Sequence, residues 1–393
     1  MDDGGSVIEV DHHQAPKGGE AVCGDVFRSC KIPGESRVIS VLSDGLGSGI
    51  KASVLATLTA SMALKYAAHS IDIRKSAEII MDTLPVCRER RISYSTFTIV
   101  DMDRSGRARI IEHGNPPFSF WSGGREVPVE KETIHLPHWK DRLIQFTRLQ
   151  LRRGDRIVFA SDGVTQAGTG RPESPTGWGD AGMRARIGGW LKRDPALSAR
   201  DLSRDLVDAA VAEDGGRILD DLTCGVHYFR EPRKLLVVTG PPFEKSRDRE
   251  LARLVEAFPG RKAICGGTTS LIVASHLKRE VEPRDPFAAP GVPPGARMEG
   301  IDLVTEGNLT LARVASLLEE RTPPMDRPAD PAQALLALLL GSDVISFMVG
   351  TRMNEAHQDP SVPVELDLRR NIVRRIARLL EKDHCKETQI AYL

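Results

Sequence analysis

The sequence predicts a two-domain protein, in which a layered α+β domain precedes a smaller α/β domain with a parallel, Rossmann-like sheet. Its 393 residues are too many for one ordinary hydrophobic core and suit two. As far as Phe229, strand-like and helical segments each occur in groups, which is typical of an α+β domain. After Leu235, strand-like segments alternate with helical ones, as they do around a parallel sheet. The expected domains are residues 1–230 and 235–393.

The strands expected in the first domain are short segments that contain many β-branched residues. They are Val38–Leu42, Thr96–Val100, Ala108–Glu112, Ile157–Ala160 and Leu222–Tyr228. The residues Asp103-Arg104-Ser105-Gly106 separate the second of these strands from the third and predict the turn of a β-hairpin.

Two helices of the first domain are indicated by spacing and by a cap. Leu55, Leu58 and Met62 recur at the spacing of one buried helix face, within the apolar segment Ala52–Ala68. Ser198, three residues before Asp201, resembles a capping box at the start of a later helix.

In the second domain, four expected strands each end in glycine. They are Leu235–Gly240, Ala263–Gly267, Leu303–Gly307 and Val344–Gly350. A glycine turn before a helix N-terminus suits an anion or a nucleotide phosphate, and ligands of open α/β sheets usually lie at such strand ends. Glycine turns also join strand to helix in many folds that bind nothing, so both readings stay open. The candidate ligand-binding residues are Gly266, Gly267, Thr268, Thr269 and Glu306.

The charge balance argues against two classes of partner. The 54 basic and 54 acidic residues cancel, so nothing favours nucleic acid or an anionic membrane. The N-terminus lacks the basic-then-apolar pattern of a signal peptide. The apolar segment Ala52–Ala68 is shorter than the roughly 20 residues of a membrane-spanning helix. We therefore expect a cytoplasmic protein.

Aspartates at the ends of strands are the main chemical signal in the sequence. A short apolar strand followed by Ser-Asp-Gly occurs twice, with Asp44 and Asp162, and further acidic positions occur at Asp25 and at Asp220-Asp221. A single Asp-Gly usually marks only a turn. Several carboxylates at one sheet edge would repel one another unless cations lay between them, and ligation by oxygen alone favours Mg²⁺ or Mn²⁺.

These motifs occur in the order found in one known family. Gly24-Asp25-Val26-Phe27, Ser43-Asp44-Gly45, Ser161-Asp162-Gly163 and Asp220-Asp221-Leu222-Thr223 resemble the metal motifs of the protein phosphatase 2C-like superfamily. Within it they resemble the bacterial branch typified by stage II sporulation protein E, whose Pro-Pro turn is matched by His113-Gly114-Asn115-Pro116-Pro117. The resemblance covers roughly residues 5–230.

The resemblance implies an α-β-β-α sandwich with two divalent cations, Mn²⁺ or Mg²⁺, at one end. Asp25 and Asp44 would hold the metal pair, and the Gly45 carbonyl would add an oxygen ligand. Asp162 and Asp220 would complete the second metal. The family pattern favours Asp220 over its neighbour Asp221 as the ligand.

The activity implied by the resemblance is hydrolysis of phosphoserine and phosphothreonine in proteins by a metal-bridging hydroxide, in bacterial signalling. An anti-sigma-antagonist-like domain is a candidate substrate, a homodimer is possible, and the second domain would regulate the enzyme or bind its target. Eukaryotic relatives often carry a histidine where this chain has Leu46-Gly47. Two alternatives stay open, a catalytically silent sensor or scaffold and a small-molecule phosphoesterase.

Overall fold

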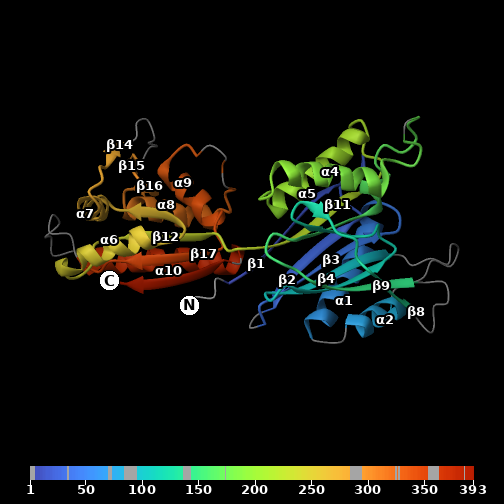
Figure 1. Ribbon diagram of the computed structural model, residues 1–393, viewed down its shortest axis with the longest axis horizontal. Coiled ribbons are helices and arrows are strands. Elements are labelled where there is room, and N and C mark those ends of the chain that lie inside the picture. Colours follow the sequence, from blue (N-terminus) through green and yellow to red (C-terminus); the bar gives the residue numbers. More distant parts are fainter. Residues whose placement is uncertain are drawn as a thin grey trace. The chain divides into compact units, whose positions relative to one another are not determined.

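The computed structural model describes residues 5–32, 35–69, 73–83, 95–135, 143–172, 174–283, 294–323, 325, 328–352, 363–384 and 386–393. The chain folds as two compact units, Met1–Glu231 and Pro232–Leu393, each with its own sheets and helices (Figure 1).

The first unit contains two antiparallel sheets. The five-stranded sheet has the order β1 (Val7–Ala15), β11 (Leu222–Arg230), β10 (Arg156–Ala160), β6 (Ser119–Ser122) and β7 (Arg125–Glu126). The six-stranded sheet has the order β2 (Val26–Ile32), β3 (Arg37–Gly45), β4 (Ser95–Asp103), β5 (Arg107–His113), β9 (Leu143–Gln150) and β8 (Glu132–His135).

The two sheets of the first unit pack face to face between two layers of helices. Leu42 of β3 and Phe159 of β10 belong to the core cluster between the sheets. Ile39 of β3 points to the opposite face, as strand alternation requires, and packs in the cluster under α1 (Gly49–Ala68) and α2 (Ile73–Thr83). The helices α3 (Asp162–Gln166), α4 (Gly179–Arg193) and α5 (Ala199–Glu213) cover the outer face of the five-stranded sheet. The predicted α-β-β-α sandwich is confirmed.

The predicted hairpin and helix cap are both present. The turn between β4 and β5 is held by the Asp103 carboxylate, whose Oδ1 accepts a hydrogen bond from the Ser105 N–H at 2.8 Å. Gly106 adopts φ +83°, a conformation that glycine reaches without strain. At the start of α5, the Ser198 hydroxyl accepts a hydrogen bond from the Asp201 N–H at 3.0 Å.

The predicted buried face of α1 is wrong in one respect, because Leu58 is 46% exposed. The side chains of α1 that are buried are small and comprise those of Ala52, Ala56, Thr59, Ala60, Ala63 and Ala67. The helix lies close to the end of β3: a Cβ atom on Gly45 would come within 2.1 Å of the Ala52 carbonyl oxygen. Only small side chains fit between backbones at this separation.

The second unit contains a seven-stranded sheet with a parallel core. Its order is β14 (Glu282–Pro283), β15 (Ala296–Met298), β16 (Ile301–Thr305), β13 (Arg261–Cys265), β12 (Lys234–Thr239), β17 (Val344–Val349) and β18 (Glu387–Tyr392). Five neighbouring strands of this sheet are parallel, in the order β16, β13, β12, β17 and β18. Along the chain they are the third, second, first, fourth and fifth parallel strands, which is a Rossmann-like order.

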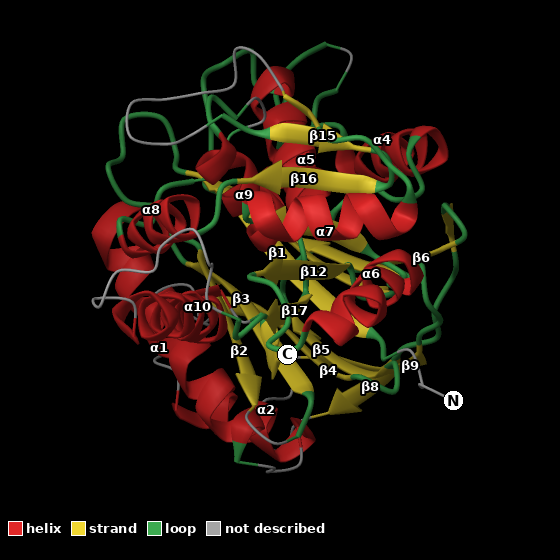
Figure 2. Ribbon diagram, turned by 90° about the vertical axis from the view of Figure 1, so that its left-hand side faces the viewer, coloured by secondary structure: helices red, strands yellow, loops and turns green. Residues whose placement is uncertain are grey.

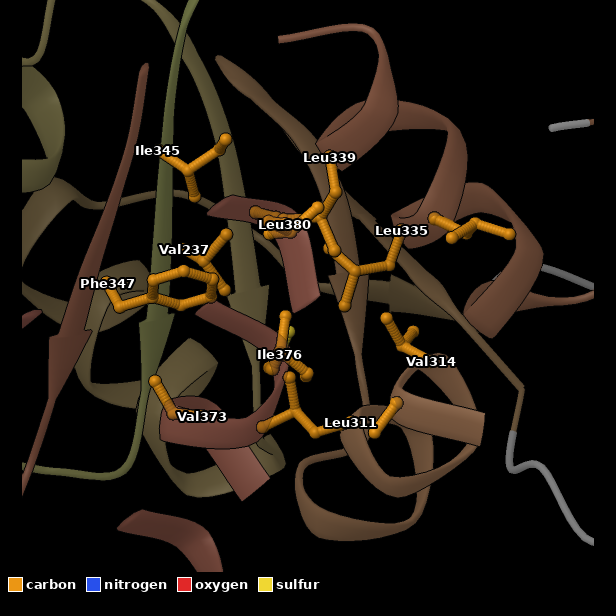
Figure 3. Close-up of a cluster of buried hydrophobic side chains, with 14 of the residues drawn as sticks. Val237, Leu311, Val314, Leu335, Leu339, Ile345, Phe347, Val373, Ile376 and Leu380 are labelled. Carbon is orange, nitrogen blue, oxygen red and sulfur yellow. The ribbon is translucent and has the colours of Figure 1, made fainter. Parts of the chain in front are cut away.

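Helices cover both faces of the parallel sheet. Leu236 of β12 packs with α6 (Asp248–Ala257) and α7 (Gly267–Leu277), whereas Val237 packs with α8 (Asn308–Glu319), α9 (Pro331–Leu340) and α10 (Pro363–His384). Figure 2 shows these helices around β12 and β17, and Figure 3 shows the cluster that contains Val237. A short 3₁₀ helix, η1 (Lys245–Arg247), precedes α6. The predicted α/β fold is confirmed. Among the described helices, none has the length and apolar character needed to cross a membrane.

Candidate metal centre

The five aspartates singled out by sequence lie at strand ends that share one edge of the sandwich. Asp44 is close to the end of β3, and Asp25 immediately precedes β2, which runs antiparallel to β3. Asp162 follows the end of β10, and Asp220 and Asp221 immediately precede β11, which runs antiparallel to β10. In each antiparallel pair, the end of one strand therefore lies beside the start of the other.

The two Ser-Asp-Gly motifs, one on each sheet, bring the carboxyl groups of Asp44 and Asp162 close enough for the charge of one to act on the other. Burial, together with the charges of Asp25, Asp162 and Asp220, raises the pKa of Asp44 to about 9. Like charges this close disfavour ionisation of the whole group. A divalent cation would reverse that preference, because it stabilises the ionised carboxylates.

The Asp25 carboxyl group is deeply buried, and hydroxyl donors lie beside it. Its pKa is raised to about 7, because burial and the charges of Asp221 and Asp162 outweigh the opposing hydrogen bonds from Ser161 and Thr223. The Thr223 hydroxyl donates to Asp25 Oδ2 at 2.7 Å. The hydroxyls therefore compensate part of the cost of burying an ionised Asp25.

Asp220 and Asp221 face different surroundings. Burial raises the pKa of Asp220, and the charge of Asp162 adds to the rise, while Lys17 lowers it. The Asp221 carboxylate accepts a hydrogen bond from the Lys17 N–H at 3.0 Å, and it lies against Gly24. Asp220 thus adjoins the Ser-Asp-Gly carboxyls, whereas Asp221 holds the loop before β2.

The glycines of both Ser-Asp-Gly motifs are required for close approach of backbones. A Cβ atom on Gly163 would lie 2.2 Å from the Asp221 carbonyl oxygen, just as one on Gly45 would collide with Ala52. Neither glycine has a positive φ, so turn formation is not the reason for glycine here. The close approach brings Asp162 next to the Asp220 segment and α1 next to Asp44.

Hydroxyl groups support the strand end that carries Asp44. The Ser95 hydroxyl donates to the Asp44 carbonyl oxygen at 2.8 Å, and the Ser43 hydroxyl donates to the Thr96 carbonyl oxygen at 3.0 Å. Asn115, in the predicted Pro-Pro turn, donates from its side-chain amide to the Thr98 hydroxyl at 3.1 Å. Ser95 and Thr98 were not singled out by sequence, since isolated hydroxyl residues in strands carry no recognisable signal.

The residues at this edge suit hard divalent cations, because the charged ligand atoms that converge there, among the residues that the structure describes, are carboxylate oxygens. Across the described part of the chain, no three Asp, Glu, His or Cys side chains already form a metal cage. Asp25, Asp44, Asp162 and Asp220 nevertheless interact with one another electrostatically across both sheets.

The candidate ligand-binding residues of the second unit lie at neighbouring strand ends. Gly266 joins β13 to α7 and adopts φ +138°, and Gly267, Thr268 and Thr269 form the first turn of α7. Glu306 follows β16, and its carboxylate accepts a hydrogen bond from the Leu309 N–H at 3.0 Å in the first turn of α8. Glu306 therefore has a local capping role.

A family match decides the relationship of the first unit. The model of the stage II sporulation protein E (SpoIIE) family matches residues 34–229. The first unit belongs to the SpoIIE family. The match includes four of the five aspartates, while β1 and Asp25 precede it. The predicted resemblance is confirmed, and no curated protein matches the chain.

Solved structures similar to this chain include several bacterial regulators. One is the structure of the PP2C phosphatase domain and a fragment of the regulatory domain of SpoIIE from Bacillus subtilis, which is 21% identical to this chain, with a TM-score of 0.47. The match covers 57% of this chain and 63% of that chain, so this chain spans less than two thirds of the length of the SpoIIE structure. The RsbU and RsbW domains of Rv1364c from Mycobacterium tuberculosis share 17% identity with this chain, with a TM-score of 0.46, and the match covers 64% of this chain and 67% of that chain. RsbX in complex with magnesium shares 18% identity with this chain, with a TM-score of 0.40, and the match covers 56% of this chain and 95% of that chain.

Proposed function

We propose that the SpoIIE-family domain is a metal-dependent phosphatase that hydrolyses phosphoserine and phosphothreonine in proteins. The main support for this proposal is that carboxyl groups from both sheets meet at one edge, where the charges of Asp25, Asp162 and Asp220 act on the carboxyl group of Asp44. So many carboxyls at one place cost stability unless they serve to bind cations. Membership of the SpoIIE family supports the same activity.

In this proposal Asp25, Asp44, Asp162 and Asp220 hold two divalent cations, Mn²⁺ or Mg²⁺, with the Gly45 carbonyl as a further ligand. Bound at these residues, the cations supply a water of lowered pKa and neutralise the charge of the phosphoryl group. Asp221 is assigned a supporting role, because its carboxylate is hydrogen-bonded to the Lys17 backbone. The Lys17 ammonium, whose charge acts on Asp220, would help to attract the substrate phosphate.

The expected partner is a phosphorylated protein in the cytoplasm, and an anti-sigma-antagonist-like domain is the candidate that the family relationship favours. The α/β unit would regulate the phosphatase or bind its target. Comparing the phosphoproteomes of cells with and without this protein identifies the substrate: we expect a small set of phosphoserine or phosphothreonine sites to accumulate in its absence.

The proposed activity predicts phosphatase turnover that depends on added metal. With p-nitrophenyl phosphate and with a phosphoserine peptide, the chain should be active in Mn²⁺ and inactive after EDTA, because the attacking water needs the bound cations to lower its pKa. Release of p-nitrophenol and of inorganic phosphate measures the two reactions. Turnover that EDTA leaves unchanged would contradict the mechanism. Metal binding without turnover on either substrate would favour a silent sensor.

A further inference from the structure

Strand β1 precedes the segment matched by the SpoIIE family and brings Gln14 to the metal end of the sandwich. Gln14 is opposite Thr223 in the antiparallel pairing of β1 with β11. Its side-chain Nε2 donates to the Thr223 hydroxyl oxygen at 3.0 Å and to the Asp25 carbonyl oxygen at 3.2 Å. One amide therefore contacts both the residue that holds Asp25 and the backbone of Asp25 itself.

The direction of these hydrogen bonds follows from chemistry. The Asp25 carbonyl oxygen can only accept, so the Gln14 amide must present its nitrogen to this side. The Thr223 hydroxyl oxygen then accepts from Gln14, and its single proton is available for Asp25 Oδ2, which lies 2.7 Å away. The Thr223 N–H is also engaged, because it donates to the Ser161 hydroxyl at 3.0 Å.

We propose that Gln14 is a positioning residue for the metal centre, acting through Thr223 to fix one oxygen of Asp25 and leave the other free for a cation. This inference rests on the proposed function of the domain. Partners behind metal ligands set both the orientation and the affinity of a site. A residue of β1, which precedes the family match, would thus support the metal centre from outside that match. Of the proposed ligands, Asp25 also precedes the match, and Asp44, Asp162 and Asp220 lie inside it.

If Gln14 had a purely structural role, its substitution would affect protein stability rather than metal affinity. The pairing of β1 with β11 extends from Val7 to Ala15, so the backbone ladder holds the strand without the Gln14 amide. If the amide served only to stabilise this pairing, its loss would change the melting temperature and leave metal affinity alone. If it positions Asp25, metal affinity changes more than stability.

The test compares Mn²⁺ binding by isothermal titration calorimetry in variants of the full chain. Gln14→Met removes the amide and keeps the side-chain length, Thr223→Val removes the hydroxyl, and Thr223→Ser restores it. Gln145→Met is a matched control, because Gln145 donates to the opposite Thr133 hydroxyl at 3.2 Å in the β8–β9 pair of the other sheet. Circular dichroism melting checks the fold of each variant.

We expect Gln14→Met and Thr223→Val each to weaken Mn²⁺ binding about 10- to 100-fold. The double variant should bind no more weakly than Thr223→Val alone, since Gln14 acts through that hydroxyl. Thr223→Ser and Gln145→Met should bind Mn²⁺ as the unmodified chain does. If Gln14→Met does not fold, Gln14→Asn replaces it, because its shorter amide loses the same contacts.

Three results would overturn the inference. Gln14→Met that folds and binds Mn²⁺ as tightly as the unmodified chain would show that the amide does not position Asp25. Fully additive losses in the double variant would show that Gln14 does not act through Thr223. Failure of the unmodified chain itself to bind Mn²⁺ would instead remove the metal centre, and with it the proposed function.

Discussion

Asp44→Asn and Asp162→Asn should each lower Mn²⁺-dependent turnover by about 1,000-fold. Each substitution keeps the shape of the side chain but removes a charge from the pair of carboxyl groups that join the two sheets. An amide oxygen is a weaker ligand than a carboxylate for a hard cation, so metal affinity should fall together with turnover. The measurement is kcat and KM with p-nitrophenyl phosphate across a range of Mn²⁺ concentrations.

Two further substitutions make this prediction specific. Asp220→Asn should lower turnover as much as Asp44→Asn, whereas Asp221→Asn should have a smaller effect, because the Asp221 carboxylate holds the Lys17 backbone. Asp208→Asn, on the exposed face of α5, is the matched control and should be fully active. Normal turnover of Asp44→Asn would refute the centre, and loss confined to Asp221→Asn would reverse the assignment of the ligand.

Asp44→Asn should also make the metal-free protein more stable at pH 8, by roughly 2–4 kcal/mol. Burial and neighbouring carboxyls raise the pKa of Asp44 to about 9 in the folded chain, against 3.8 for an ordinary aspartate. Between these values the folded state binds a proton that the unfolded state does not, so stability falls as pH rises towards 9 and is recovered as pH falls towards 4. Asparagine does not titrate and removes this dependence.

Urea unfolding in EDTA at pH 6 and pH 8.5 measures this effect. All four tryptophans of the sequence lie in the first unit, so their fluorescence reports the unfolding of that unit. The unmodified chain should lose stability between the two pH values, and Asp44→Asn should lose much less. Equal losses in the two proteins would show that Asp44 titrates normally, and Asp208→Asn should behave like the unmodified chain.

The sequence was sufficient to predict the architecture and the location of the acidic residues. Apolar strands that end in Ser-Asp-Gly locate Asp44 and Asp162 at strand ends, and the ordered motifs identify the family that unites them. The alternation of strand-like and helical segments in the second unit likewise predicts its parallel sheet. These signals are local, because each depends on residues that are adjacent in the chain.

Other features depend on contacts between distant segments, which local patterns do not record. The alanine face of α1 reflects how closely the helix approaches β3, whereas the spacing of leucines favoured Leu58 as a buried residue. Gly163 is needed because of the Asp221 carbonyl, which immediately precedes β11, and Gln14 matters because of its register with Thr223. These relationships appear only once the strands are paired.

The most direct test of the metal centre is a crystal structure of the chain grown with Mn²⁺, with anomalous scattering used to locate the metal. We expect two anomalous peaks a few ångströms apart, coordinated by Asp25, Asp44, Asp162 and Asp220. Peaks elsewhere on the molecule, or these four carboxyl groups without a peak at saturating Mn²⁺, would contradict it.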